Sequence, residues 1–338
     1  MAHRSFITAS LLTACTLSLV SSLHADHPPI KFTPPPQDKG EPFPWFTGPL
    51  LTPSARTIPN GHANIEPYEF VNTQFGAYDS HWNSHDTPSN FYNVNTSVPM
   101  QIGLPANFDL YLNPAWSWNH TSGASHWVLN DFGFGFDYQL VNYNYSKGDW
   151  WPALKLNVQA NAPIGTYQKL HPKSKGTDIG GSGSWAPSAG FVMSHLYWWG
   201  GHIFFAPRFN IQYTIPTPVH VKGYNAYGGG HHTHGTVFPG HILRLLFGFE
   251  LALSQRWGLA GDVLYLHANK TRFQGHAGAT AGVPNSVGGP SSESLSLAPA
   301  VEYNWSANYG VIAGVWFSVA GRNAPEFANA VIALNIYH

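Results

Sequence analysis

The stretch ILRLLFGFELALS, residues 242–254, alternates strictly between two kinds of side chain. One face is wholly apolar: Leu243, Leu245, Phe247, Phe249, Leu251 and Leu253. The opposite face carries Arg244 and Glu250 among smaller residues. A β-strand points successive side chains to opposite sides, so this strand would present one face to lipid and the other to a polar interior. That is the pattern of a transmembrane β-barrel strand.

Eleven further segments are typical of strands, and several alternate as cleanly: 62–76, 91–104, 108–119, 127–142, 151–162, 184–197, 201–215, 258–268, 293–305, 309–320 and 326–338. With 240–254 they predict an all-β, closed antiparallel barrel of about twelve strands over residues 62–338, because lipid cannot satisfy the free edges of an open sheet. The connections alternate between short turns and long loops, the longest being 163–183, 216–239 and 269–292. We expect the long loops outside the cell and the short turns in the periplasm.

The composition fits a barrel and also a large secreted β-sandwich. The sandwich, however, would have no reason to separate long from short connections. Charged residues make up 10% of the 338 residues, against about 25% in ordinary soluble proteins. The net charge of −1 argues against nucleic acid as a partner. Tryptophans flank the predicted short turns, as an interfacial girdle would require: Trp150, Trp151, Trp198, Trp199 and Trp257.

The N-terminus predicts export. Residues 1–25 have the form of a signal peptide, with Arg4, an apolar stretch from Phe6 to Leu23, and Ala25 at the cleavage point. Cys15, the only cysteine, ends a Leu-Thr-Ala-Cys sequence that would also suit lipidation. No later run is long and apolar enough for a transmembrane helix. We therefore expect a protein of the Gram-negative outer membrane that needs no disulfide.

Residues 26–61 are rich in proline and show no periodicity. Repeated proline favours extended chain without regular pairing. Two alternatives follow: a periplasmic tail, or a plug that enters the lumen with Trp45 and Phe46 as anchors.

Prolines also fall inside the predicted strands, at Pro99, Pro114, Pro207 and Pro299. Each lacks the N–H that a strand ladder uses, so we expect bulges or kinks there. In the first strand, Glu66 and Glu69 could share a face only across a bulge.

The segment Gly48-Pro49-Leu50-Leu51-Thr52-Pro53, then Ile58-Pro59-Asn60-Gly61-His62 and the Glu66-bearing strand, resembles the opening of a bacterial family. That family is the outer-membrane transporters named for the phenol-degradation (meta-cleavage) pathway. About twenty residues carry the specific likeness, and Pro53 and Ser54 stand where the family usually has acidic residues. The resemblance implies a barrel that passes small hydrophobic or aromatic molecules.

Alternation places nine charged side chains on the lumen face: Asp109, Asp131, Asp137, Lys155, Arg208, Arg244, Glu250, Asp262 and Glu302. Charges of both signs inside a narrow barrel can set ion selectivity along a substrate path. Alternatively they form a structural network that props the wall. Arg208 and Arg244 fall on neighbouring predicted strands, so they could share Glu250.

A His-rich loop suggests metal binding, since imidazole is the commonest metal ligand. Its candidate ligands are His231, His232 and His234. No carboxylate lies nearby in the sequence, and the flanking glycines would not preorganise a site. A solvated loop with incidental metal affinity is the alternative, and no cofactor is expected.

A third motif, His120-Thr121-Ser122, resembles the His-x-Ser of the outer-membrane phospholipase A family, another twelve-stranded barrel. Gly123 stands where that family has asparagine, and no residue that would orient the histidine is identifiable. We therefore expect no enzyme activity.

The function predicted from these patterns is passive passage of small, hydrophobic or aromatic molecules across the outer membrane. The expected partners are membrane lipid, a small solute and the barrel assembly machinery. The main alternative is a structural or adhesive barrel acting through its extracellular loops, and the remote alternative is a phospholipase.

Overall fold

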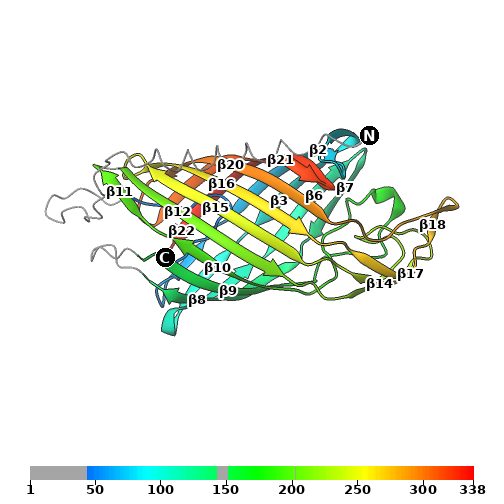
Figure 1. The fold of residues 1–338 in the computed structure, drawn as a ribbon, viewed down its shortest axis with the longest axis horizontal. Coiled ribbons are helices and arrows are strands. Elements are labelled where there is room, and N and C mark those ends of the chain that lie inside the picture. The colour runs from blue at the N-terminus through cyan, green and yellow to red at the C-terminus, as the bar shows by residue number, and fades with distance from the viewer. Residues whose placement is uncertain (1–43, 143–150, 202) are drawn as a thin grey trace, which may run out of the picture.

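A computed structural model describes residues 44–142, 151–201 and 203–338. The predicted signal peptide, Cys15 and residues 26–43 lie outside the described residues, as does Trp150. Twelve long antiparallel strands close into a barrel (Figure 1). In chain order they are β1 with β2 (Ala63–Ile65, Tyr68–Tyr78), β3 with β4 (Ser84–Ser97, Met100–Leu104), β5 with β6 (Phe108–Asn113, Ala115–Thr121), β7 with β8 (Ala124–Leu129, Phe132–Val141), β9 (Ala153–Ala162), β10 (Ala186–Ser194), β12 (Ile203–Thr214), β15 (Ile242–Ala252), β16 (Trp257–Ala268), β20 (Ser292–Asn304), β21 (Tyr309–Arg322) and β22 (Ala324–Tyr337).

The sheet closes where β22 pairs with the first strand. Asn64 of β1 lies opposite Tyr337, and Asn72 of β2 lies opposite Asn329. Each other long strand pairs with its neighbours in sequence, so the predicted all-β closed barrel is confirmed. The second strand begins at Ser84 rather than near residue 91, because its outer end extends the hairpin with β2.

Four of the long strands are broken in the middle, three of them at a proline: Pro67, Pro99 and Pro114. The kinks expected at Pro99 and Pro114 are therefore confirmed. Neighbouring strands still bond across the breaks, since the Glu66 N–H donates to the Pro99 carbonyl at 2.9 Å. Pro207 and Pro299 lie within the unbroken strands β12 and β20, opposite Phe249 and Gly261, so the kinks expected at these two positions are not found.

The two faces of β15 behave as the alternation predicts. Phe247 on the outer face is 45% exposed, whereas Glu250 on the inner face is 1% exposed. This is the reverse of a soluble sheet, where apolar side chains are buried and charges face the solvent. Lipid covers the apolar face of such a barrel.

Exposed aromatic residues surround the end that carries the short turns. Trp199, Trp257 and Trp305 are each more than 40% exposed, and the Trp305 ring stacks on Tyr309 with 6.4 Å between centroids. Amphipathic rings prefer the membrane–water boundary. Among the described residues, no helix reaches the length and apolarity needed to span a bilayer.

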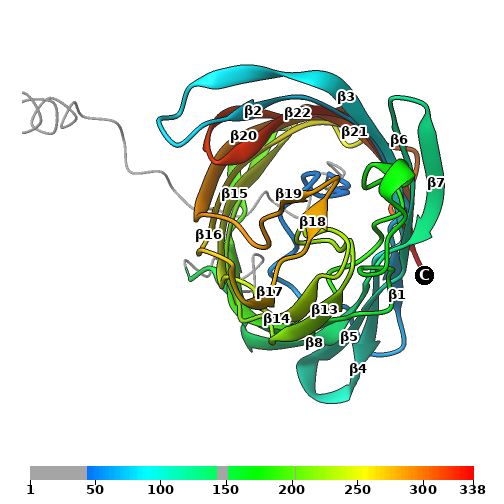
Figure 2. The same cartoon turned by 90° about the vertical axis from the view of Figure 1, so that its right-hand side faces the viewer.

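The long loops at the other end fold over the barrel opening (Figure 2). They contain a three-stranded sheet and a small hairpin: β13 (Val219–Lys222), β14 (His234–Phe238), β17 (Arg272–His276), β18 (Ala279–Thr280) and β19 (Val283–Pro284). Val219, Val221 and Val237 form a core beneath Tyr227 and Phe273. Burial raises the pKa of Tyr227 to about 12. Its hydroxyl donates to the Ser182 carbonyl at 2.9 Å. We call these loops the cap.

The remaining short elements lie in the connections between the long strands. They are strand β11 (Tyr197–Gly200) and two 3-10 turns, Pro105–Asn107 and Pro172–Ser174.

Candidate functional site

The N-terminal segment, residues 44–61, lies inside the barrel (Figure 2). It starts at the short-turn end, where the Trp45 N–H donates to the Gln255 carbonyl at 3.0 Å. It returns to that end, where the Gly61 N–H donates to the Gly103 carbonyl at 3.3 Å and β1 then begins. The segment therefore crosses the lumen as a loop, in the half that holds the short turns.

Two buried glutamates hold the start of this segment. Glu302 of β20 accepts the Thr47 N–H, and Glu250 of β15 accepts the Gly48 N–H at 2.7 Å. The second oxygen of Glu250 pairs with Arg208. These contacts join residues 202 and 255 positions apart. Both carboxylates are thus used to satisfy backbone donors that the irregular segment cannot pair within itself.

Asp262 of β16 holds the deepest part of the segment. One oxygen accepts the Leu51 N–H at 3.1 Å, and the other accepts both the N–H and the hydroxyl of Thr52, at 3.0 and 2.5 Å. Hydrogen bonds to a carboxylate are about twice as strong as neutral ones. Asp262 therefore attaches two consecutive residues of the segment to the wall.

The opposite wall holds the returning half. The Gln139 side chain accepts the Thr57 N–H at 2.8 Å and donates to the Ala55 carbonyl at 2.9 Å. Asp109 accepts the Ile58 N–H at 2.7 Å. The segment is consequently tied to both sides of the barrel.

Apolar contacts add two further anchors. Leu50 and Ala55 are buried, and the wall beneath them is built mainly from small side chains that leave room for the segment: Ala153, Ala206, Ala252, Ala260, Ala298, Ala300 and Ala333. Phe46 packs against the Ala55 cluster.

Two glycines allow the segment to approach the wall. A Cβ atom at Gly103 would lie 2.1 Å from the Pro59 carbonyl oxygen, and one at Gly248 would lie 2.6 Å from the Thr52 hydroxyl. Real Cβ atoms do not approach other atoms so closely. Neither position can therefore carry a side chain while the segment stays where it is.

The remaining predicted lumen charges have other partners. Lys155 and Asp137 form a fully buried ion pair with 2.7 Å between Nζ and Oδ2. Asp131 lies towards the cap, where its oxygens accept the Gly165 and Ser182 N–H groups at 3.1 and 2.8 Å. The nine predicted residues therefore do not form one network.

The prediction that Arg208 and Arg244 share Glu250 is wrong. Their strands do pair, but Arg208 lies opposite Gly248 while Arg244 lies opposite Gln212. Arg244 is four residues from Gly248 along β15, which is about 13 Å at the usual rise of a strand. Only Arg208 reaches Glu250.

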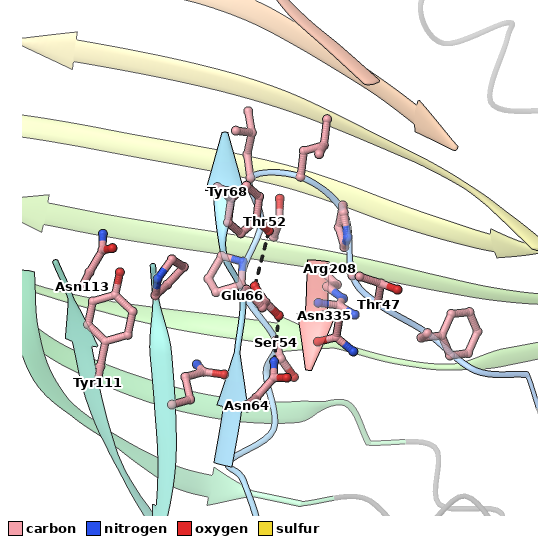
Figure 3. A pocket seen from close by; sticks show the side chains of 18 of the residues that line it. Thr47, Thr52, Ser54, Asn64, Glu66, Tyr68, Tyr111, Asn113, Arg208 and Asn335 are labelled. Atoms are coloured by element: carbon pink, nitrogen blue, oxygen red, sulfur yellow. Dashed lines mark hydrogen bonds between the residues drawn. The ribbon is translucent and has the colours of Figure 1, made fainter. Parts of the chain in front are cut away.

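A cavity of about 450 Å³ lies beside the N-terminal segment (Figure 3). The segment forms one side, and β-strand residues on the barrel wall form the other, among them Tyr68, Tyr111, Asn113 and Arg244. Glu66 lies inside it, accepting from Asn64 Nδ2 at 2.7 Å and from the Tyr68 hydroxyl at 3.3 Å. Glu66, Tyr111 and Gln139 are not among the lumen residues predicted from the sequence, although the lumen-facing alternation of their strands indicates the last two.

The three histidines proposed as metal ligands do not gather into one site. The His231 ring faces Tyr224 edge-on, and the His234 ring lies 5.5 Å from His276, between centroids. No group of three or more potential ligand residues occurs within the described ranges. The loop is nevertheless well folded, because the Thr233 hydroxyl accepts the Gly230 N–H at 2.8 Å and donates to the Ala277 carbonyl at 2.6 Å. The loop is folded, but it does not bring the three histidines together.

The His120-Thr121-Ser122 motif does not form the pair that hydrolysis would need. Ser122 occupies the tip of the β6–β7 hairpin with φ of 42°. His120 instead contacts the Ser125 hydroxyl through Nδ1 at 2.8 Å and stacks on Trp118. The resemblance to the phospholipase motif is thus limited to sequence.

A twelve-stranded closed barrel with an apolar outer face and an aromatic girdle defines the class: an outer-membrane β-barrel protein. No family model matches the chain, and no curated protein matches it in sequence. The fold is similar to an outer-membrane channel of Pseudomonas putida F1, with a TM-score of 0.62 and 9% identity over 84% of this chain and 98% of that one.

Two further solved structures are more distant. The transport unit of the Escherichia coli autotransporter AIDA-I gives a TM-score of 0.43 with 9% identity, covering 82% of this chain and 90% of that one. A TodX monoaromatic hydrocarbon channel variant gives 0.35 with 12% identity, covering 82% and 91%.

Proposed function

We propose that this protein is a passive outer-membrane channel for small molecules, with a lumen closed at rest by the N-terminal segment. The observation that carries the proposal is that four lumen carboxylates accept backbone N–H groups of this one segment: Glu250, Glu302, Asp262 and Asp109. Irregular backbone needs such acceptors wherever it leaves water. An intact barrel of this size would otherwise leave a solute path through its centre.

The attachment suits reversible displacement. Most of its polar contacts are hydrogen bonds that water can replace once the segment leaves, and each contributes about 0.5–3 kcal/mol net. The segment begins and ends on the same side of the barrel, so it can withdraw without passing through the lumen. Opening would therefore require no change in the strands of the wall.

Small hydrophobic or aromatic molecules are the proposed substrates. The resemblance of residues 48–67 to the transporters named for the phenol-degradation pathway supports this class and membership of that family. Tyr68, Phe70 and Tyr111 line the cavity beside the segment and provide aromatic surface. The similar solved structure from Pseudomonas putida F1 is described as an outer-membrane channel, which agrees with the proposal.

Single-channel conductance in planar bilayers tests the proposal. We expect low, infrequent conductance from the mature protein and steady conductance after deletion of residues 26–58. A Thr47→Cys/Asn304→Cys pair provides a reversible lock, because the parent side chains are 2.9 Å apart between Oγ1 and Oδ1 and the only native cysteine is Cys15. Oxidation should close this variant and reduction should reopen it, while each single-cysteine variant should not respond.

Equal conductance with and without the segment would overturn the proposal that the segment closes the lumen. If no correctly folded variant conducts ions, the proposal that the protein is a channel is overturned. That result would instead favour a barrel that works through its cap.

A further inference from the structure

Of the three predicted lumen cations, Arg244 alone has no ion pair with a described residue. Lys155 pairs with Asp137, and Arg208 pairs with Glu250. Arg244 has no hydrogen bond or ion pair with any residue in the part of the chain that the structure describes. Its side chain is exposed to the cavity.

The carboxylates of Glu66 and Asp262 form their hydrogen bonds with other groups. Glu66, the acid that lines the same cavity, accepts from Asn64 and Tyr68. Asp262, the next acid along the wall, accepts from Leu51 and Thr52. Arg244 thus presents a guanidinium to the cavity without an ion pair to any described residue.

The groups around Arg244 are suited to a small organic anion. A guanidinium binds a carboxylate through two parallel hydrogen bonds. Tyr111 and Asn113 lie on one wall (Figure 3), and Phe70 and Tyr68 provide ring faces. A volume of about 450 Å³ falls within the usual range for small-molecule sites.

We propose that this cavity binds a small aromatic carboxylate, with the carboxylate on Arg244 and the ring against the aromatic wall. An inorganic anion would use the charge but leave the aromatic surface without a partner. The inference deepens the proposed channel function, on which it rests, by naming an anionic substrate class for the lumen.

Isothermal titration of the refolded, full mature protein in detergent tests this directly. The probes are benzoate, the neutral benzyl alcohol and inorganic phosphate. Arg244→Gln should weaken benzoate binding by at least about tenfold, the lower range for a hydrogen bond to a charged group, and leave benzyl alcohol unaffected. Arg244→Lys keeps the charge but loses the paired geometry, so its affinity should be intermediate.

Arg272→Gln is the matched control, because Arg272 is exposed on β17 in the cap. It should bind benzoate like the parent protein. Heat-dependent gel mobility of each variant checks that the barrel is folded.

Equal benzoate affinity in the parent and Arg244→Gln would overturn the site, and so would absence of benzoate binding to the folded parent. Phosphate binding as tightly as benzoate would overturn the aromatic part of the proposal. These results are separate from the channel test, since deletion of residues 26–58 can open a conductance whether or not benzoate binds.

Discussion

Thr52 and Asp262 are 210 positions apart in sequence, yet both the amide and the hydroxyl of Thr52 donate to one oxygen of Asp262. The second oxygen accepts the neighbouring Leu51 amide. A single wall carboxylate therefore positions the deepest turn of the N-terminal segment. The first prediction concerns this contact.

Asp262→Ala should increase the open probability of the channel. The substitution leaves two backbone N–H groups without acceptors, and each costs about 1–3 kcal/mol when it stays buried. The ratio of closed to open states, measured by single-channel recording, should therefore fall by about tenfold or more. Asp131→Asn is the matched control, since Asp131 binds the cap rather than the segment, and it should leave gating unchanged.

Gly103→Ala should displace the returning half of the segment. The new Cβ would lie 2.1 Å from the Pro59 carbonyl oxygen and 2.4 Å from that of Ile58, so the segment must move away from β4. We expect more frequent opening and faster cleavage of the segment by added protease. Gly289→Ala serves as control, because nothing lies within 4 Å of its Cβ. Unchanged protection in Gly103→Ala would contradict the observed path.

Lys155→Met should destabilise the barrel rather than alter gating. It leaves Asp137 buried without its counter-ion, and breaking a buried pair costs about 3–5 kcal/mol. Urea unfolding in lipid vesicles, followed by tryptophan fluorescence, measures the loss. The double variant Lys155→Met/Asp137→Asn should recover much of it, because the neutral side chain no longer needs a counter-charge. If the double variant is no more stable than Lys155→Met, the loss of stability does not come from an unpaired buried charge.

Phe247→Arg tests the assignment of the outer face. A cation on the lipid face near the membrane midplane costs about 2–4 kcal/mol, whereas one near the boundary costs about 0–1 kcal/mol. Phe247 lies mid-strand, paired with Phe209 and Val263, while Leu253 lies at the turn after β15. Leu253→Arg should therefore cost much less. Similar losses of unfolding free energy for both would place the membrane elsewhere on the barrel.

Much of the wall could be predicted from alternation alone. The strand at Ile242–Ala252, the lumen side of Glu250 and Asp262, and the breaks at Pro99 and Pro114 all follow from local rules. A strand has a period of two, and proline lacks a ladder donor. The early start of β3 was missed because residues 84–90 do not alternate between apolar and polar. The folded cap was missed because β14 pairs with β17, which lies well beyond it in the sequence.

The amino-acid sequence by itself determined which side chains face lipid and which face the lumen, because that choice depends only on neighbours two positions apart. Tertiary structure alone decided what the lumen charges contact. Glu250 meets Gly48 across 202 positions, while Arg244, on the same strand, meets no charged partner within the described chain. No local pattern encodes such pairings, because they arise only when the closed barrel brings the irregular N-terminal segment against a wall built from later strands.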